Sequence, residues 1–285
     1  MRYLSAYYTD KGKRKGVNQD SLLVSKAKKR GREVVLAVIC DGMGGLERGE
    51  AASFEVVCSF AAWLRESFSA LAEEEEFEDE LYDSWEMLFQ SVHQKIKKYG
   101  KDHGIRIGTT ATVMLLWQER LYIAHVGDCR IYEIEKQIRQ LTKDQVKGSL
   151  GRDEDTASHI LMQGVGASKT VRPVYHSKDV KENAVYLLCT DGFRHKISIQ
   201  ELEKEFAPKE LADEKAMVRQ GEKIAKEVIK RGERDNISVI LLRTIPAPAD
   251  CLAVEDSCEG EYSIDKEAIV SDMASIALHQ NAQKP

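Results

Sequence analysis

The sequence has no apolar run long enough to cross a membrane. Val34–Cys40, one of its longest, falls far short of the roughly 20 residues that a membrane-spanning helix needs. The N-terminal stretch up to Gly16 also lacks the apolar segment of a secretory signal, so we expect no signal peptide. The 6 cysteines are scattered without a CxxC pair, which argues against a zinc site or a disulfide framework. These absences predict a cytoplasmic protein that does not insert into membranes.

An excess of positive charge is missing as well. The net charge is −5 at pH 7, so nothing in the overall composition favours binding to nucleic acid or to an anionic membrane surface. The 285 residues are enough to bury a substantial core. The composition therefore predicts an ordinary globular protein.

Short apolar runs alternate with amphipathic segments along most of the chain. Apolar residues recur about every fourth position in Glu50–Leu71 and Asp79–Tyr99, and Lys215–Arg231 also reads as a helix. We expect strands over 3–9, 21–27, 33–40, 110–117, 121–126, 129–135, 184–189 and 236–243, with those between 110 and 135 forming an antiparallel meander. Consecutive hairpins and paired helices predict an α+β fold in which helices cover antiparallel sheet.

The character of the sequence changes at "TIPAPAD", where two prolines lie close together. We therefore predict one domain over residues 1–245, followed by a linker and an acidic C-terminal tail over 246–285. Apolar residues are spaced as in a helix over 265–280, so the tail could form one short helix.

Aspartates stand at the boundaries of several predicted strands. Asp41 and Asp191 each follow an apolar run, whereas Asp20 and Asp235 come just before one. Asp128 interrupts another run directly after a glycine. In an antiparallel sheet, the end of one strand lies beside the start of its neighbour. We therefore expect these carboxylates to meet at one rim of the sheet.

Carboxylates gathered in this way repel one another unless cations neutralise them. Oxygen ligands suit Mg²⁺ or Mn²⁺, and the absence of nearby histidine ligands argues against zinc. The glycine-rich sequence after Asp41 allows close approach, so the Gly42 carbonyl could be a ligand too. Two metal ions about 3.5–4 Å apart could activate water for an in-line phosphoryl displacement. Any one of these motifs alone is usually a turn, but several in order at strand boundaries favour a site.

The chain resembles the metal-dependent serine/threonine protein phosphatases of type 2C, in their compact bacterial form. The resemblance is carried by "TDKGKRKGVNQDS", "AVICDGMGG", "GTTATVMLL", "LYIAHVGDCRIY", "QLTKDQ", "VYLLCTDGF" and "RDNISVILL", and it extends roughly from Tyr3 to Thr244. It implies a four-layer α/β/β/α sandwich, with two central antiparallel sheets flanked by helix pairs and a metal centre at one end.

The resemblance also implies roles for the aspartates. Asp41 would bridge two Mn²⁺ or Mg²⁺ ions, the Gly42 carbonyl would bind one of them, and Asp191 and Asp235 would complete the other. Asp20 would hold metal-bound water, and Asp128, together with Asp191, would hold a third, weaker ion. A metal-bound hydroxide would then attack the phosphoester directly, without a phosphoenzyme.

Three positions depart from the family pattern. Lys15 stands where the family often has an arginine that grips the substrate phosphate, and Arg14 beside it could substitute. Met43 replaces a histidine proposed as general acid in some members, which leaves that acid unassigned, and His125 or His195 has only a weak claim to the role.

The third departure is Gln145, which takes the place of a usual histidine before an atypical segment. This segment would border the cleft, so the departure concerns the choice of substrate and not the core chemistry.

The leading hypothesis is a monomeric phosphatase that removes phosphate from phosphoserine and phosphothreonine and opposes a Ser/Thr kinase. Its partners would be that kinase and its phosphorylated substrates. Two alternatives stay open: a scaffold that binds phosphoproteins without turnover, and a two-metal hydrolase of small phosphomonoesters or nucleic acid. The acidic net charge disfavours nucleic acid as the substrate.

Overall fold

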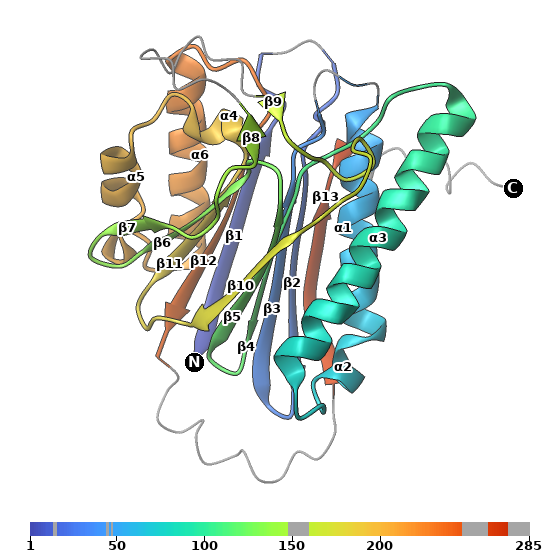
Figure 1. Ribbon diagram of the computed structural model, residues 1–285. Coiled ribbons are helices and arrows are strands. Elements are labelled where there is room, and N and C mark those ends of the chain that lie inside the picture. Colours follow the sequence, from blue (N-terminus) through green and yellow to red (C-terminus); the bar gives the residue numbers. More distant parts are fainter. Residues whose placement is uncertain (14–15, 44–45, 47, 148–159, 247–261, 273–285) are drawn as a thin grey trace, which may run out of the picture.

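Two central antiparallel sheets face each other, and helices cover the outer face of each sheet (Figure 1). The computed structural model describes residues 1–13, 16–43, 46, 48–147, 160–246 and 262–272. This four-layer α/β/β/α sandwich confirms the predicted fold class. No helix in the described part of the chain is long and apolar enough to cross a membrane.

The larger sheet has six strands in the order β10-β5-β4-β3-β2-β13, and the smaller has five in the order β1-β12-β11-β6-β7. A separate pair, β8 and β9, lies at the upper end of the sandwich in the view of Figure 1. The strands are β1 Arg2–Asp10, β2 Ser21–Lys29, β3 Arg32–Cys40, β4 Ala111–Trp117, β5 Arg120–Val126, β6 Arg130–Ile134, β7 Ile138–Gln140, β8 Val146–Lys147, β9 Ile160–Leu161, β10 Val174–Asp179, β11 Val185–Cys189, β12 Ile237–Ile245 and β13 Tyr262–Val270.

The helices divide between the two outer faces. Helices α1 (Gly49–Glu66) and α3 (Phe77–His103) cover the six-stranded sheet, and α6 (Glu214–Lys230) covers the other (Figure 1). The predicted helix over Glu50–Leu71 is interrupted at Ser67, so a short α2 follows α1. The remaining short helices are α2 Phe68–Leu71, α4 Asp191–Arg194, α5 Ile199–Glu205 and η1 Pro208–Glu210.

Burial of both strand faces explains the uninterrupted apolar runs. In β3, alternate side chains from Val34 to Cys40 enter the core beneath α1 and α3. The side chains between them, Val35, Ala37 and Ile39, enter the core between the two sheets. Because neither face meets solvent, no polar alternation appears, and the first polar side chain after Arg32 and Glu33 is Asp41 at the strand end.

The predicted meander between residues 110 and 135 is only half right. Strands β4 and β5 do form a hairpin, but β6 pairs with β11 and β7 in the opposite sheet. The chain crosses between the sheets at Gly127, whose φ is 113°. A Cβ there would lie 2.5 Å from the Thr110 side chain, so this crossing requires glycine.

The short helix predicted within 265–280 is wrong for residues 265–270, because these residues belong to β13. Strand β13 pairs antiparallel with β2 and occupies what would otherwise be an open sheet edge. Backbone pairing along this edge outweighs the weak helical spacing of the apolar residues. Residues 273–280 of the predicted helix lie outside the described residues.

Candidate active site

Strand register brings the five predicted aspartates to one end of the sandwich. In the larger sheet Ser21 pairs with Cys40, so Asp20 and Asp41 flank the same step of the ladder. In the smaller sheet Cys189 pairs with both Val239 and Arg130. Asp191 therefore follows β11 at the end where Asp235 precedes β12 and Asp128 precedes β6. We call this group, Asp20, Asp41, Asp128, Asp191 and Asp235, the aspartate rim.

Asp20 connects the two sheets. Its side chain is only 2% exposed, and its Oδ2 accepts hydrogen bonds from Ser238 Oγ at 2.6 Å and Thr190 Oγ1 at 3.2 Å. Oδ1 of the same carboxylate is buried and has no hydrogen-bond partner. A buried carboxylate oxygen without a hydrogen-bond donor is energetically unfavourable. Such an oxygen is suited to coordinate a cation or to accept a hydrogen bond from water bound to that cation.

The electrostatics of the aspartate rim are dominated by burial and like charge. Burial raises the pKa of Asp20 to about 7, and the charges of Asp191 and Asp235 add to the increase, against hydrogen bonds from Ser238 and Thr190 that lower it. Burial also raises the pKa of Asp41 well above its ordinary value, as do the charges of the other four aspartates.

Asp128 responds in the same way. Burial raises its pKa to about 6, followed by the charge of Asp191, while the Arg194 guanidinium opposes the increase. Since these carboxylates perturb one another, they lie within electrostatic reach, and the rim attracts cations.

The backbone after Asp41 is held tightly. Asp41 N–H donates to Thr110 Oγ1 at 2.8 Å, and its carbonyl accepts from Thr110 N–H at 2.9 Å. Gly42 N–H donates to the Gln19 carbonyl at 3.1 Å, and a Cβ at Gly42 would lie 2.6 Å from both that oxygen and the Gly49 carbonyl. The close approach of three backbone segments therefore requires glycine at position 42.

The donor set of the rim fits a hard cation. It offers carboxylate and backbone oxygens, including the buried Oδ1 of Asp20. The neighbouring thiols of Cys40, Cys129 and Cys189 are poor metal ligands, because burial raises the pKa of each and keeps it protonated. Among the described residues, no three His, Cys, Asp or Glu side chains stand close enough together to hold a metal ion in this arrangement. The rim therefore offers suitable ligand atoms, to be completed by backbone carbonyls and water, as is usual for Mg²⁺.

Two charged residues beside the rim were not singled out as site residues from sequence. Arg194 Nη2 lies 4.0 Å from Asp128 Oδ2 and 3.5 Å from Asp144 Oδ2. Glu233 Oε2 lies 3.7 Å from His195 Nδ1. The signal for Arg194 was the sequence "DGFRH", since one helical turn after Asp191 returns the chain to the rim. For Glu233 it was only the position two residues before Asp235.

The two histidines considered from sequence differ in position. His195 Nε2 lies 3.8 Å from Asp191 Oδ2, and the interaction with the nearby Glu233 carboxylate is the main cause that raises the pKa of His195. His125 is buried, with Nδ1 2.9 Å from Thr112 Oγ1, and burial lowers its pKa. Of the two, only His195 contacts a rim aspartate in the structure described.

The positions that depart from the family pattern have different outcomes. Arg14 and Lys15 lie outside the described residues. Met43 directs its sulfur toward Gly164, where a Cβ would come within 2.9 Å. Gln145 Oε1 accepts from Gly127 N–H at 2.9 Å, so this side chain supports the turn that carries Asp128.

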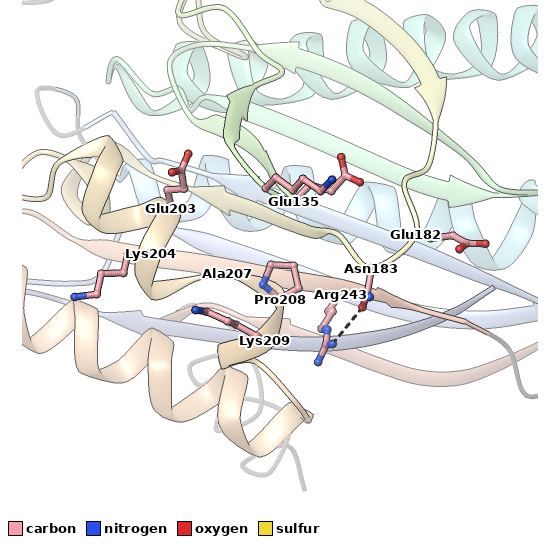
Figure 2. A pocket seen from close by; sticks show the side chains of 10 residues that line it. Glu135, Glu182, Asn183, Glu203, Lys204, Ala207, Pro208, Lys209 and Arg243 are labelled. Atoms are coloured by element: carbon pink, nitrogen blue, oxygen red, sulfur yellow. Dashed lines mark hydrogen bonds between the residues drawn. The ribbon is translucent and has the colours of Figure 1, made fainter.

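A cavity lies at the end of the five-stranded sheet opposite the aspartate rim, and Figure 2 shows the side chains that line it. Its volume is ≈ 710 Å³, and Arg243 donates from Nη2 to Asn183 Oδ1 at 3.4 Å in its wall. Glu135 follows the end of β6 and Asn183 precedes β11, so this cavity is a full strand length from the aspartate rim. Its lining mixes both signs of charge: Glu135, Lys136, Glu182, Asn183, Glu203, Lys204, Ala207, Pro208, Lys209 and Arg243.

The sandwich fold is shared with solved structures of bacterial serine/threonine phosphatases. Stp1 of Staphylococcus aureus superposes with a TM-score of 0.69 at 22% identity, covering 86% of this chain and 96% of that one. The catalytic domain of the serine/threonine phosphatase PstP, solved with two manganese ions, superposes with a TM-score of 0.66 at 20% identity, covering 86% of this chain and 99% of that one.

Sequence comparison identifies the family. The profile of protein phosphatase 2C matches residues 10–241. The serine/threonine phosphatase stp of Listeria monocytogenes is 28% identical over 253 residues, which are 83% of this chain and 94% of that protein. PhpP of Streptococcus pneumoniae is 28% identical over 209 residues, 68% of this chain and 80% of that protein. The chain belongs to the protein phosphatase 2C family, and the resemblance inferred from its motifs is confirmed.

Proposed function

We propose that this protein hydrolyses phosphoserine and phosphothreonine in proteins with the help of two Mn²⁺ or Mg²⁺ ions at the aspartate rim. The observation that carries the proposal is the set of buried and half-buried, mutually repelling carboxylates at one end of a protein phosphatase 2C fold. The names of stp and PhpP, and the two manganese ions in PstP, support the same reaction and the same cofactor.

Asp41 and the Gly42 carbonyl would hold the ions from the larger sheet, and Asp191 and Asp235 would hold them from the smaller. When bound, such ions increase the acidity of water and neutralise charge on the phosphoryl oxygens. Asp20 would orient the attacking water, because Ser238 and Thr190 occupy Oδ2 and leave Oδ1 facing no donor.

A third, weaker cation at Asp128 and Asp191 is part of the proposal. Arg194, 4.0 Å from Asp128, already supplies positive charge there, so this cation would bind more weakly than the pair. Arg14 or Lys15 would contact the substrate phosphate, as the resemblance to the family implies. The substrates would be products of a Ser/Thr kinase, and the enzyme would act as a cytoplasmic monomer.

The decisive experiment measures phosphate release from phosphothreonine and phosphotyrosine peptides and from p-nitrophenyl phosphate, with Mn²⁺ or Mg²⁺. We expect the wild type to release phosphate from the phosphothreonine peptide. In Asp41→Asn the rate of release should fall by at least about a hundredfold, because a bridging carboxylate is removed. Asp179→Asn, at the far end of β10 and exposed, is the matched control that keeps full activity.

Three results would contradict the proposal. Metal binding without phosphate release would favour a phosphoprotein-binding scaffold. Turnover of p-nitrophenyl phosphate alone would favour a small-molecule phosphatase. Unchanged activity in Asp41→Asn would contradict the assignment of the site.

A further inference from the structure

Strand β13 lies beyond the matched family residues, which end at 241, and its carboxyl end reaches the aspartate rim. Val270 pairs with Leu22, the second residue of β2. Because the pairing is antiparallel, the chain after Val270 emerges beside the residues that precede β2. Those residues are Asn18, Gln19 and Asp20.

Two hydrogen bonds join this end to the start of β2, one to the loop before it and one to its first residue. Asn18 N–H donates to Asp272 Oδ2 at 2.7 Å, and Ser21 Oγ donates to Ser271 Oγ at 3.0 Å. The first bond is assisted by the charge of the carboxylate, which makes it one of the stronger hydrogen bonds that a backbone N–H can donate.

The Asn18 side chain links this contact to Asp20 by a hydrogen bond. Its Oδ1 accepts from Asp20 N–H at 3.1 Å, and its Nδ2 donates to Thr9 Oγ1 at 2.8 Å. The loop is also tied to the other half of the rim, since Gln19 N–H donates to Asn236 Oδ1 at 3.0 Å. One hydrogen bond, from Asp20 N–H to the Asn18 side chain, thus connects the residue that contacts Asp272 to the Asp20 backbone.

Strand β13, which ends two residues before Asp272, is itself held in place. Glu267 pairs with Arg65 of α1 at 2.6 Å, and the Tyr262 hydroxyl donates to the Leu64 carbonyl at 2.6 Å. Ile264 and Ile269 pack against the core beneath α1 and α3. The strand is therefore anchored from its first residue to its last, and its end is not free to drift from the loop.

We propose that Asp272 is a positioning residue for Asp20, so that the C-terminal strand fixes the loop of the active site. The proposal rests on the proposed function only in giving Asp20 a part in the reaction. Asp272 itself touches the backbone of Asn18 and acts on Asp20 through it. Asparagine at 272 keeps an acceptor oxygen, whereas alanine removes it.

The test compares Asp272→Ala and Asp272→Asn in the full chain, with Asp265→Ala as the matched control. Asp265 lies within β13 and pairs with Lys28 at 3.2 Å, toward the end of the strand that is far from Asp272. Hydrogen exchange of the backbone amides of residues 18–21 is the first readout, because it requires neither substrate nor metal.

We expect amide exchange at Asn18 and Asp20 to become about tenfold faster in Asp272→Ala, as for loss of one charge-assisted hydrogen bond. Asp272→Asn should stay within about threefold of the wild type, and Asp265→Ala should leave these amides unchanged. In the phosphothreonine assay, kcat of Asp272→Ala should fall several-fold with little change in KM, and asparagine should restore most of it.

Equal exchange at residues 18–21 in Asp272→Ala and Asp265→Ala would overturn the inference, even if the enzyme is a phosphatase. A uniform increase in exchange throughout the chain would also overturn it, because it would mean that Asp272 only stabilises the fold. If the wild type released no phosphate, the proposed function would fail, and the exchange measurement would still decide the role of Asp272.

Discussion

Replacing Asp20 with asparagine should stabilise the metal-free protein above pH 7. Burial and like charge raise the pKa of Asp20 from 3.8 to about 7. At roughly 1.4 kcal/mol per pKa unit, ionising this carboxyl in the folded protein costs about 4 kcal/mol relative to the unfolded chain. Asparagine avoids that cost and can still accept the hydrogen bonds from Ser238 and Thr190. Its amide nitrogen would replace the unpartnered Oδ1, at a penalty of about 1–3 kcal/mol, so we expect a net gain of about 1–3 kcal/mol.

The difference should depend on pH with a definite sign. Since the pKa of Asp20 is higher in the folded than in the unfolded protein, the folded state binds more protons between about pH 4 and 7. The contribution of Asp20 to the stability of the wild type should therefore be greatest below pH 4, fall as the pH rises through 7, and then level off. Asp20→Asn lacks this contribution, so the variant should be the more stable protein at pH 8 and the less stable one near pH 4.

Urea unfolding in EDTA at pH 4.5, 6 and 8 measures this difference, with exposed Asp179→Asn as the control. Saturating Mn²⁺ should stabilise the wild type more than Asp20→Asn, because the ionised carboxylate favours the bound cation. An Asp20→Asn variant that is no more stable than the wild type at pH 8 in EDTA, and that follows the same pH dependence, would refute this account of Asp20.

Two further predictions concern the rim and its backbone. Gly42→Ala should unfold at a lower urea concentration and lose activity, because the added Cβ would lie 2.6 Å from backbone atoms. The control is Gly221→Ala in α6, where the added Cβ would lie 3.6 Å from its nearest atoms. The stability of this control should be unchanged or increase by up to about 1 kcal/mol, because alanine has the higher helix propensity. Asp128→Asn should raise the Mn²⁺ concentration for half-maximal activity several-fold while the melting temperature changes little, and an unchanged metal requirement would remove Asp128 from the site.

The aspartate rim could be predicted from the sequence because its cause is local. A strand segment that is buried on both faces, such as Val34–Cys40 of β3, excludes charged side chains, so Asp41 stands just after its end. Antiparallel pairing then brings the ends and starts of strands together without any knowledge of side-chain contacts. The positions of Asp20, Asp41, Asp191 and Asp235 follow from these two rules, before the register of a single strand is known.

Strand β13 could not be predicted in this way, because its structure depends on a distant partner. The segment Tyr262–Val270 mixes apolar and charged residues, and an irregularity between Ile264 and Lys266 breaks the alternation typical of a strand. Its partner β2 lies more than two hundred residues earlier in the chain. The open edge of the sheet, and not the local sequence, determines the conformation of this segment.

The change of sheet at Gly127 escaped prediction for a related reason. A glycine between two apolar runs is compatible with a bulge, with a hairpin or with a crossing to another sheet. What selects the crossing is the contact with Thr110, which allows no Cβ at position 127. Similarly, the hydrogen bonds from Thr190 and Ser238 to Asp20 join residues of both sheets and follow from their packing.

Cation binding and folding should be coupled in this protein, because the burial of the rim carboxylates both opposes folding and favours a bound cation. The sandwich places its unavoidable polar groups at strand ends, and at one end these groups are carboxylates whose ionisation opposes folding. A ligand that binds only the folded state stabilises it in proportion to the logarithm of its concentration over its Kd. Ions that relieve the repulsion should therefore bind most tightly at the aspartate rim, where ionised carboxylates most destabilise the metal-free fold. By tying the Asp20 loop to β13, Asp272 would keep the rim in place while it carries that unfavourable charge.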